Sequence, residues 1–174
     1  MRSLIVVAAL GWAATAATQT PAAAPTFAAD YVMKAGQSDA FEIQSGQLAA
    51  SKASSPDVRA FGQRMVKDHT QSTQMVLAAA RKSGLPTAPP PALRPDQQDK
   101  LTQLRAADGA AFDTLFASQQ LQAHQEALDL QGAYARNGDD ENLKKAAAKI
   151  APVVTMHLDM LRKGGAHAAS GMTH

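Results

Sequence analysis

The chain of 174 residues contains no cysteine, and this absence excludes several kinds of site. Without a thiol there is no disulfide framework and no c-type haem attachment, and an N-terminal lipid anchor on cysteine is not expected. Aromatic residues make up only 5% of the chain, and β-branched residues are scarce beside alanine and glutamine. This composition favours helices over sheets, and it predicts a fold that is stabilised by packing alone.

Neither sign of charge predominates, because the net charge is only +2 and acidic and basic residues are interspersed. No basic block points to nucleic acid as a partner. No nucleophile elbow, phosphate-binding loop or dinucleotide fingerprint occurs in the sequence. An enzyme that works without a metal is therefore the weakest hypothesis, and the sequence does not favour an enzymatic function.

The first twenty residues, MRSLIVVAALGWAATAATQT, have the pattern of an export signal. Arg2 gives a basic start, residues 3–12 are mostly apolar, and the small residues that follow fit cleavage after Ala16 or Ala17. The apolar run is too short to span a bilayer as a permanent helix. We therefore expect a signal peptide over residues 1–17, then a flexible lead-in over 18–26. The mature protein is expected to be periplasmic or secreted, without a transmembrane helix.

Apolar periodicity predicts four long helices and one short helix in the rest of the chain. The predicted ranges are 27–53, 56–83, 96–107, 110–136 and 139–163. The second start is the clearest, with Ser55 as N-cap, Pro56 at the first helical position and Asp57 in the first turn. Gly84 ends that helix, and Gly164 with its neighbouring glycine is expected to end the last one, leaving 164–174 as a flexible tail.

The predicted connections between the helices define the topology. A short connection joins the first two long helices and residues 137–140 join the last two, so each pair forms an antiparallel hairpin. The proline-rich segment 84–95 and the short helix after it join the two hairpins by one long crossover. One such crossover is the ferritin-like arrangement. We predict an all-α, ferritin-like four-helix bundle over residues 27–163.

Each long predicted helix carries one metal-competent side chain: Glu42, His69, His124 and His157. The first three lie within a few residues of their helix middles, and His157 lies about five residues, or ~7.5 Å, from the middle of its helix. Helix midpoints share a level in an antiparallel bundle, so this pattern is what a metal site in a bundle core requires. Neutral imidazoles and one carboxylate can hold a single Fe, Mn, Zn or Cu ion. The structural alternative is a buried polar layer in which Glu42 accepts a hydrogen bond from a histidine without any metal.

Two further carboxylates lie close in sequence to these candidates. Asp39 comes one turn before Glu42 and could add a second carboxylate. Asp68 is adjacent to His69, so it is expected to project about 100° away from the imidazole around the helix.

Three runs of the sequence resemble a known family: FEIQSGQLAASKASSPDVRAFGQRMVKDHTQS, FDTLFASQQLQAHQEALDL and LKKAAAKIAPVVTMHLDML. They are similar to domain-of-unknown-function family 4142, whose members are exported bacterial proteins with a ferritin-like fold. The resemblance covers residues 27–163 and includes Glu42 and all three core histidines. It implies the fold, a periplasmic compartment and association with the outer membrane, but no activity.

The chain departs from the di-iron pattern of the wider ferritin-like superfamily. Such a site needs Glu-x-x-His on two helices, but Val66 and Val154 stand three residues before His69 and His157. His124 also occupies the helix that would offer a further glutamate. The missing anionic bridges argue against di-iron oxidase or iron-storage chemistry and leave a mononuclear site as the metal hypothesis.

Two functions remain open from the sequence. The first is an exported protein that binds one metal ion in its core and is linked to envelope stress. The second is a non-catalytic structural or interaction protein of the cell envelope, with a vestigial polar core layer and an envelope protein as partner. Convergence of the four side chains favours the first, and histidines at different depths favour the second. The metal, the partner and the oligomeric state are not specified.

Overall fold

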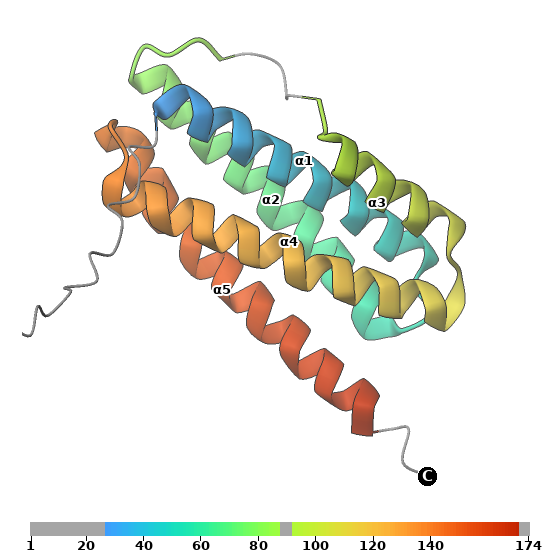
Figure 1. The fold of residues 1–174 in the computed structure, drawn as a ribbon. Coiled ribbons are helices and arrows are strands. Elements are labelled where there is room, and N and C mark those ends of the chain that lie inside the picture. The colour runs from blue at the N-terminus through green and yellow to red at the C-terminus, as the bar shows by residue number, and fades with distance from the viewer. Residues whose placement is uncertain (1–26, 88–91, 171–174) are drawn as a thin grey trace, which may run out of the picture.

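A computed structural model describes residues 27–87 and 92–170. This part of the chain contains five helices and no strand: α1 (Ala28–Lys52), α2 (Pro56–Lys82), α3 (Pro95–Ala106), α4 (Gly109–Asn137) and α5 (Glu141–Ser170) (Figure 1). The all-α prediction is confirmed. The predicted signal peptide and lead-in lie outside the described residues, as do residues 171–174 of the predicted tail.

The ends of α2 follow from local sequence chemistry. Ser55 caps the start of α2, where its hydroxyl accepts a hydrogen bond from the backbone N–H of Val58 at 3.4 Å. At the other end Gly84 has φ of +70°, a conformation that glycine adopts without strain. The backbone N–H of Leu85 then reaches back to the carbonyl of Ala80 at 3.0 Å and closes the helix.

The last helix is longer than predicted. The paired glycines at 164 and 165 were expected to end it, but α5 continues to Ser170. Glycine lowers helix propensity by about 1 kcal/mol without blocking the backbone hydrogen bonds, so two glycines do not force an end. Extension moves the midpoint of α5 to between residues 155 and 156, next to His157.

The long helices pack as two hairpins, α1 with α2 and α4 with α5 (Figure 1). Helix α1 also contacts α4, and α2 contacts α5, while the short α3 lies against α1 and α4. Asp113 of α4 ties the hairpins together at one end. Its carboxylate accepts from the backbone N–H and hydroxyl of Ser54 and from the N–H of Ser55. No helix in the described part of the chain is long and apolar enough to cross a bilayer.

Helices α1 and α2 approach very closely where two glycines face each other. A Cβ added to Gly62 would lie 2.7 Å from the carbonyl oxygen of Gly46, and one added to Gly46 would lie 2.8 Å from the carbonyl oxygen of Gly62. Only glycine fits at such a backbone contact. This contact sets the distance between α1 and α2 one to two turns from the polar residues at their middles.

A buried polar layer divides the apolar core into two clusters. One cluster includes Tyr31, Val76 and Ile150, and the other includes Phe41, Met65 and Leu161. Between them, all four long helices contribute buried polar side chains: Asp39, Glu42, His69, His124 and His157. Because apolar packing lies on both sides of this layer, its polar groups must form hydrogen bonds with one another or bind a ligand that replaces those bonds.

Candidate metal centre

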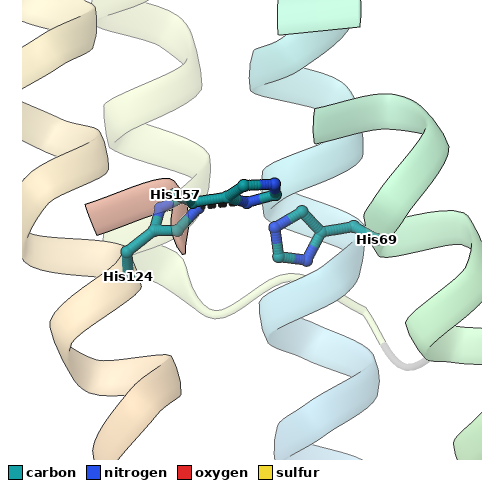
Figure 2. A group of neighbouring side chains, drawn as sticks. All are labelled: His69, His124 and His157. Carbon is teal, nitrogen blue, oxygen red and sulfur yellow. Dashed lines mark hydrogen bonds between the residues drawn. The ribbon is translucent and has the colours of Figure 1, made fainter. Parts of the chain in front are cut away.

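Three histidines from three helices meet in the polar layer. His69 comes from α2, His124 from α4 and His157 from α5, and one ring nitrogen of each lies within 4.8 Å of the others (Figure 2). None is more than 3% exposed. Phe61 closes the cluster from the side of the second apolar core, with its ring centroid 5.5 Å from that of His157.

One nitrogen of each ring is held by an acceptor outside the cluster. Asp39 Oδ1 lies 2.9 Å from Nδ1 of His69, and Asp68 Oδ2 lies 3.0 Å from Nε2 of His157. The backbone carbonyl of Gln120 lies 3.0 Å from Nδ1 of His124. A carboxylate or a backbone carbonyl only accepts, so each of these outer nitrogens carries the proton. A carboxylate or carbonyl behind the imidazole is the arrangement that orients histidine toward a metal.

The inner nitrogens of neutral rings are then all unprotonated. Nε2 of His124 lies 3.1 Å from Nδ1 of His157, so two lone pairs face each other across a hydrogen-bonding distance. Nε2 of His69 is buried and has no hydrogen-bond partner among the described residues. Three converging lone pairs repel one another, and a cation placed between them removes the repulsion.

Two of the three rings, those of His124 and His157, hold a proton poorly. Burial lowers the pKa of His124 well below its ordinary value, and the neighbouring charges of His69 and His157 lower it further. Burial also lowers the pKa of His157, although its hydrogen bond to Asp68 opposes the shift. Burial acts in the same direction on His69, but the hydrogen bond to Asp39 and the charge of Glu42 outweigh it, so the pKa of His69 is raised. The closest pair of rings therefore resists protonation.

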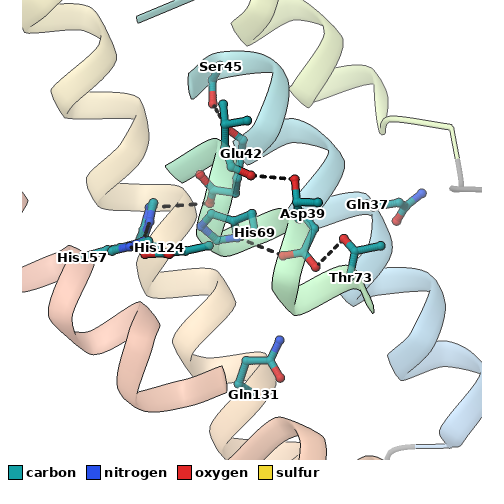
Figure 3. A network of polar contacts seen from close by, with 12 residues as sticks. Gln37, Asp39, Glu42, Ser45, His69, Thr73, His124, Gln131 and His157 are labelled. Carbon is teal, nitrogen blue, oxygen red and sulfur yellow. Dashed lines mark hydrogen bonds and ion pairs between the residues drawn. The ribbon is translucent and has the colours of Figure 1, made fainter. Parts of the chain in front are cut away.

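Glu42 lies beside the cluster and is completely buried. Its Oε1 is 3.5 Å from Nδ1 of His124, the nitrogen already bonded to the Gln120 carbonyl, and neither carboxylate oxygen has a hydrogen-bond partner among the described residues (Figure 3). Burial raises the pKa of Glu42 to about 8, with the charge of His69 acting against this shift. A carboxyl without partners in this position needs a positive charge nearby to ionise.

The arrangement is close to what a metal ion requires. Ligand nitrogens about 2.0–2.1 Å from a tetrahedral ion lie about 3.3 Å from one another. The separation of 3.1 Å between His124 and His157 already fits this geometry. A metal ion at this position would also require His69 to move inward, since the three ligand atoms are up to 4.8 Å apart. The acidic side chains of Asp39, Asp68 and Glu42 lie beside the three rings and would offset the charge of a divalent ion.

The structure brings the three predicted histidines together and places the predicted Glu42 next to them, though on the outer edge of His124. Metal binding by these four residues stays a prediction. Asp39 is part of the site, but as the partner of His69, while Thr73 donates to its second oxygen at 2.9 Å. Sequence reasoning missed the role of Asp68, whose expected rotation away from His69 is what lets it reach His157 on α5.

A comparison with known families finds one that matches most of the chain. The profile of the family described as "Domain of unknown function (DUF4142)" matches residues 13–163, so the chain belongs to this family. The match confirms the predicted resemblance and begins fourteen residues earlier than the range 27–163. Neither the curated proteins nor the solved structures contain a match to this chain.

Proposed function

We propose that this protein binds one divalent transition-metal ion through His69, His124 and His157, with Glu42 as an adjacent counter-charge. The observation that carries the proposal is the convergence of three buried histidines from three helices, with one ring nitrogen of each within 4.8 Å of the others. Imidazole ligands suit Fe, Mn, Zn and Cu ions, and a single ion needs none of the bridging glutamates that the sequence lacks.

The packing of the helices supports a ferritin-like four-helix arrangement as the scaffold of this site. Two antiparallel hairpins are joined by a long connection that contains α3, and the ligands come from the middles of facing helices. Together with the signal-like residues 1–17, this supports the proposal of an exported, periplasmic metal-binding protein that is linked to envelope stress. Cell fractionation of the untagged protein, with the signal segment intact, tests the compartment: recovery in the cytoplasm contradicts it.

Elemental analysis of untagged protein tests the metal site. We expect close to one metal ion per chain in the wild type and less than a tenth of this in a His69→Ala/His157→Ala variant. The matched control is His167→Ala/His174→Ala, which removes the two histidines outside the cluster and should keep the metal.

A second measurement prevents a folding defect from being read as lost binding. Circular dichroism should show the same helix content in all three proteins at the temperature of the metal analysis. Wild-type protein that is isolated without metal, and that takes up no Fe, Mn, Zn or Cu ion after dialysis, contradicts the proposal. Such a protein would leave the polar layer with a purely structural role.

A further inference from the structure

A pocket of about 320 Å³ between α2 and α5 reaches the histidine cluster from the surface. Its walls include Arg64, Asp68, His69, Ser72, Lys149 and Val153. A second hollow of about 400 Å³ lies between α1, α3 and α4, and no histidine lines it. We propose that the α2–α5 pocket binds a small anionic ligand, which takes an open coordination position on the metal. This inference rests on the proposed metal site.

The pocket is connected to the metal centre by two of its wall residues. His69 lines the pocket and also offers one of the three inner nitrogens. Asp68 lines it as well and holds the outer nitrogen of His157 at 3.0 Å. A ligand in this pocket therefore lies beside His69, whose ring must move inward to complete the site.

The coordination number leaves a position for such a ligand. Three histidines fill three positions of a tetrahedral ion, and three protein ligands with one open position are typical of metal sites that bind exogenous groups. Glu42 is not one of the converging ligands, and its Oε1 lies 3.5 Å from the outer nitrogen of His124.

A buried hydroxyl in the wall lacks a partner. Ser72 lies one turn after His69 on α2, is only 3% exposed and has no hydrogen-bond partner for Oγ among the described residues. Leaving a buried hydroxyl unsatisfied costs about 1–3 kcal/mol, so the position calls for an acceptor from outside the chain. The hydroxyl can donate to an anion that occupies the pocket.

The charge of the wall selects the sign of the ligand. Arg64 and Lys149 form no ion pair with the described residues. The guanidinium of Arg64 makes only a long contact, 3.5 Å, to the sulfur of Met156. Asp68 is the one acidic residue of the wall, and its carboxylate is already bonded to His157. Two cations without carboxylate partners beside a divalent ion attract an anion rather than a neutral or positive ligand.

Azide titration of the Co²⁺-loaded protein tests this inference. Co²⁺ serves as the metal because its visible absorption bands respond to a change in coordination, and azide serves as a small anionic probe. We expect azide to change the spectrum saturably in the wild type. Arg64→Gln should raise the azide dissociation constant severalfold, because it removes one of the two cations of the pocket wall. Lys67→Gln is the matched control, since Lys67 is exposed on the same helix and does not line the pocket.

Two further variants test the position of the ligand. Val153→Trp fills the α2–α5 pocket and should abolish the azide response, while Leu130→Trp fills the other hollow and should preserve it. Ser72→Ala should weaken azide binding severalfold without lowering the stability of the metal-free protein, because the hydroxyl has no partner to lose. Helix content and Co²⁺ stoichiometry, measured for every variant, show that each protein has kept its fold and its site.

The possible results separate the two proposals. Failure of the wild type to bind Co²⁺ overturns both the metal site and the inference that rests on it. One bound Co²⁺ whose spectrum does not respond to azide overturns the inference and leaves the metal site standing. An azide response of equal strength in Val153→Trp and Leu130→Trp also overturns it, because the anion then reaches the metal by another route.

Discussion

Replacing Glu42 with glutamine should stabilise the metal-free protein. The carboxyl is completely buried without a hydrogen-bond partner, and burial raises its pKa to about 8. In the unfolded chain its pKa is about 4.5, so the carboxyl is ionised at pH 7 and takes up a proton on folding. The cost of this protonation corresponds to the 2.5 pH units between the two values (7 − 4.5). At about 1.4 kcal/mol per unit, this costs about 3 kcal/mol of unfolding free energy. Glutamine has nearly the shape and polarity of the protonated acid and avoids this cost.

The pH dependence gives the prediction its sign. The folded state holds the proton of Glu42 up to about pH 8 and the unfolded state releases it near 4.5, so this residue makes the wild type less stable as pH rises through that window. The stability of the glutamine variant lacks this pH dependence. Its advantage should be close to zero at pH 4, about 3 kcal/mol at pH 7 and at most about 5 kcal/mol above pH 8.

Urea unfolding of metal-stripped protein, followed by circular dichroism at several pH values, measures this difference. Glu126→Gln on α4 is the control, because that side chain is exposed and should change stability little at any pH. A gain that is absent, or that is the same from pH 4 to 8.5, refutes the reasoning. An absent gain would mean that Glu42 is ionised in the folded state and that the charge of His69 fully compensates it. With metal bound, the wild type should instead be more stable than Glu42→Gln, since the ion then stabilises the carboxylate.

Three other changes have defined outcomes. Gly62→Ala should lower the unfolding free energy by about 1–3 kcal/mol in a urea titration, because its Cβ would meet backbone atoms at 2.7–2.9 Å; Gly164→Ala, where a Cβ meets nothing within 4 Å, should not lower it. Asp39→Asn should weaken metal affinity about 10–100-fold in a competition titration with a chelator, and unchanged affinity would show that the partner of His69 does not orient it. Asp113→Ala should lower the unfolding free energy by about 1 kcal/mol, because the hydrogen bonds from Ser54 and Ser55 to its carboxylate are lost, yet keep the metal stoichiometry of the wild type.

The sequence predicted the helices well where local chemistry decides. The N-cap at Ser55 and the glycine at 84 act through hydrogen bonds and backbone angles of adjacent residues, so both ends of α2 were predicted within one residue. The end of α5 was wrong because Gly164 and Gly165 lower helix propensity without preventing the helix from continuing. Whether a glycine ends a helix depends on a left-handed backbone angle, which Gly84 has and which the residue type alone does not impose.

For the candidate site, position along the helix selected His69 and His124, since midpoints of antiparallel helices share a level. His157 lay about five residues from the predicted middle of its helix and was selected by its place in the apolar seam, and the observed length of α5 removes most of this offset. Only the tertiary structure decided how their rings turn. The acceptors that hold the outer nitrogens include Asp68, which is remote from His157 in the chain, and the Gln120 carbonyl, which any residue type would supply. The pocket between α2 and α5 likewise depends on how two helix faces meet. Sequence spacing therefore determined which residues share the layer, whereas ring orientation, proton position and access depend on contacts between helices that no local pattern encodes.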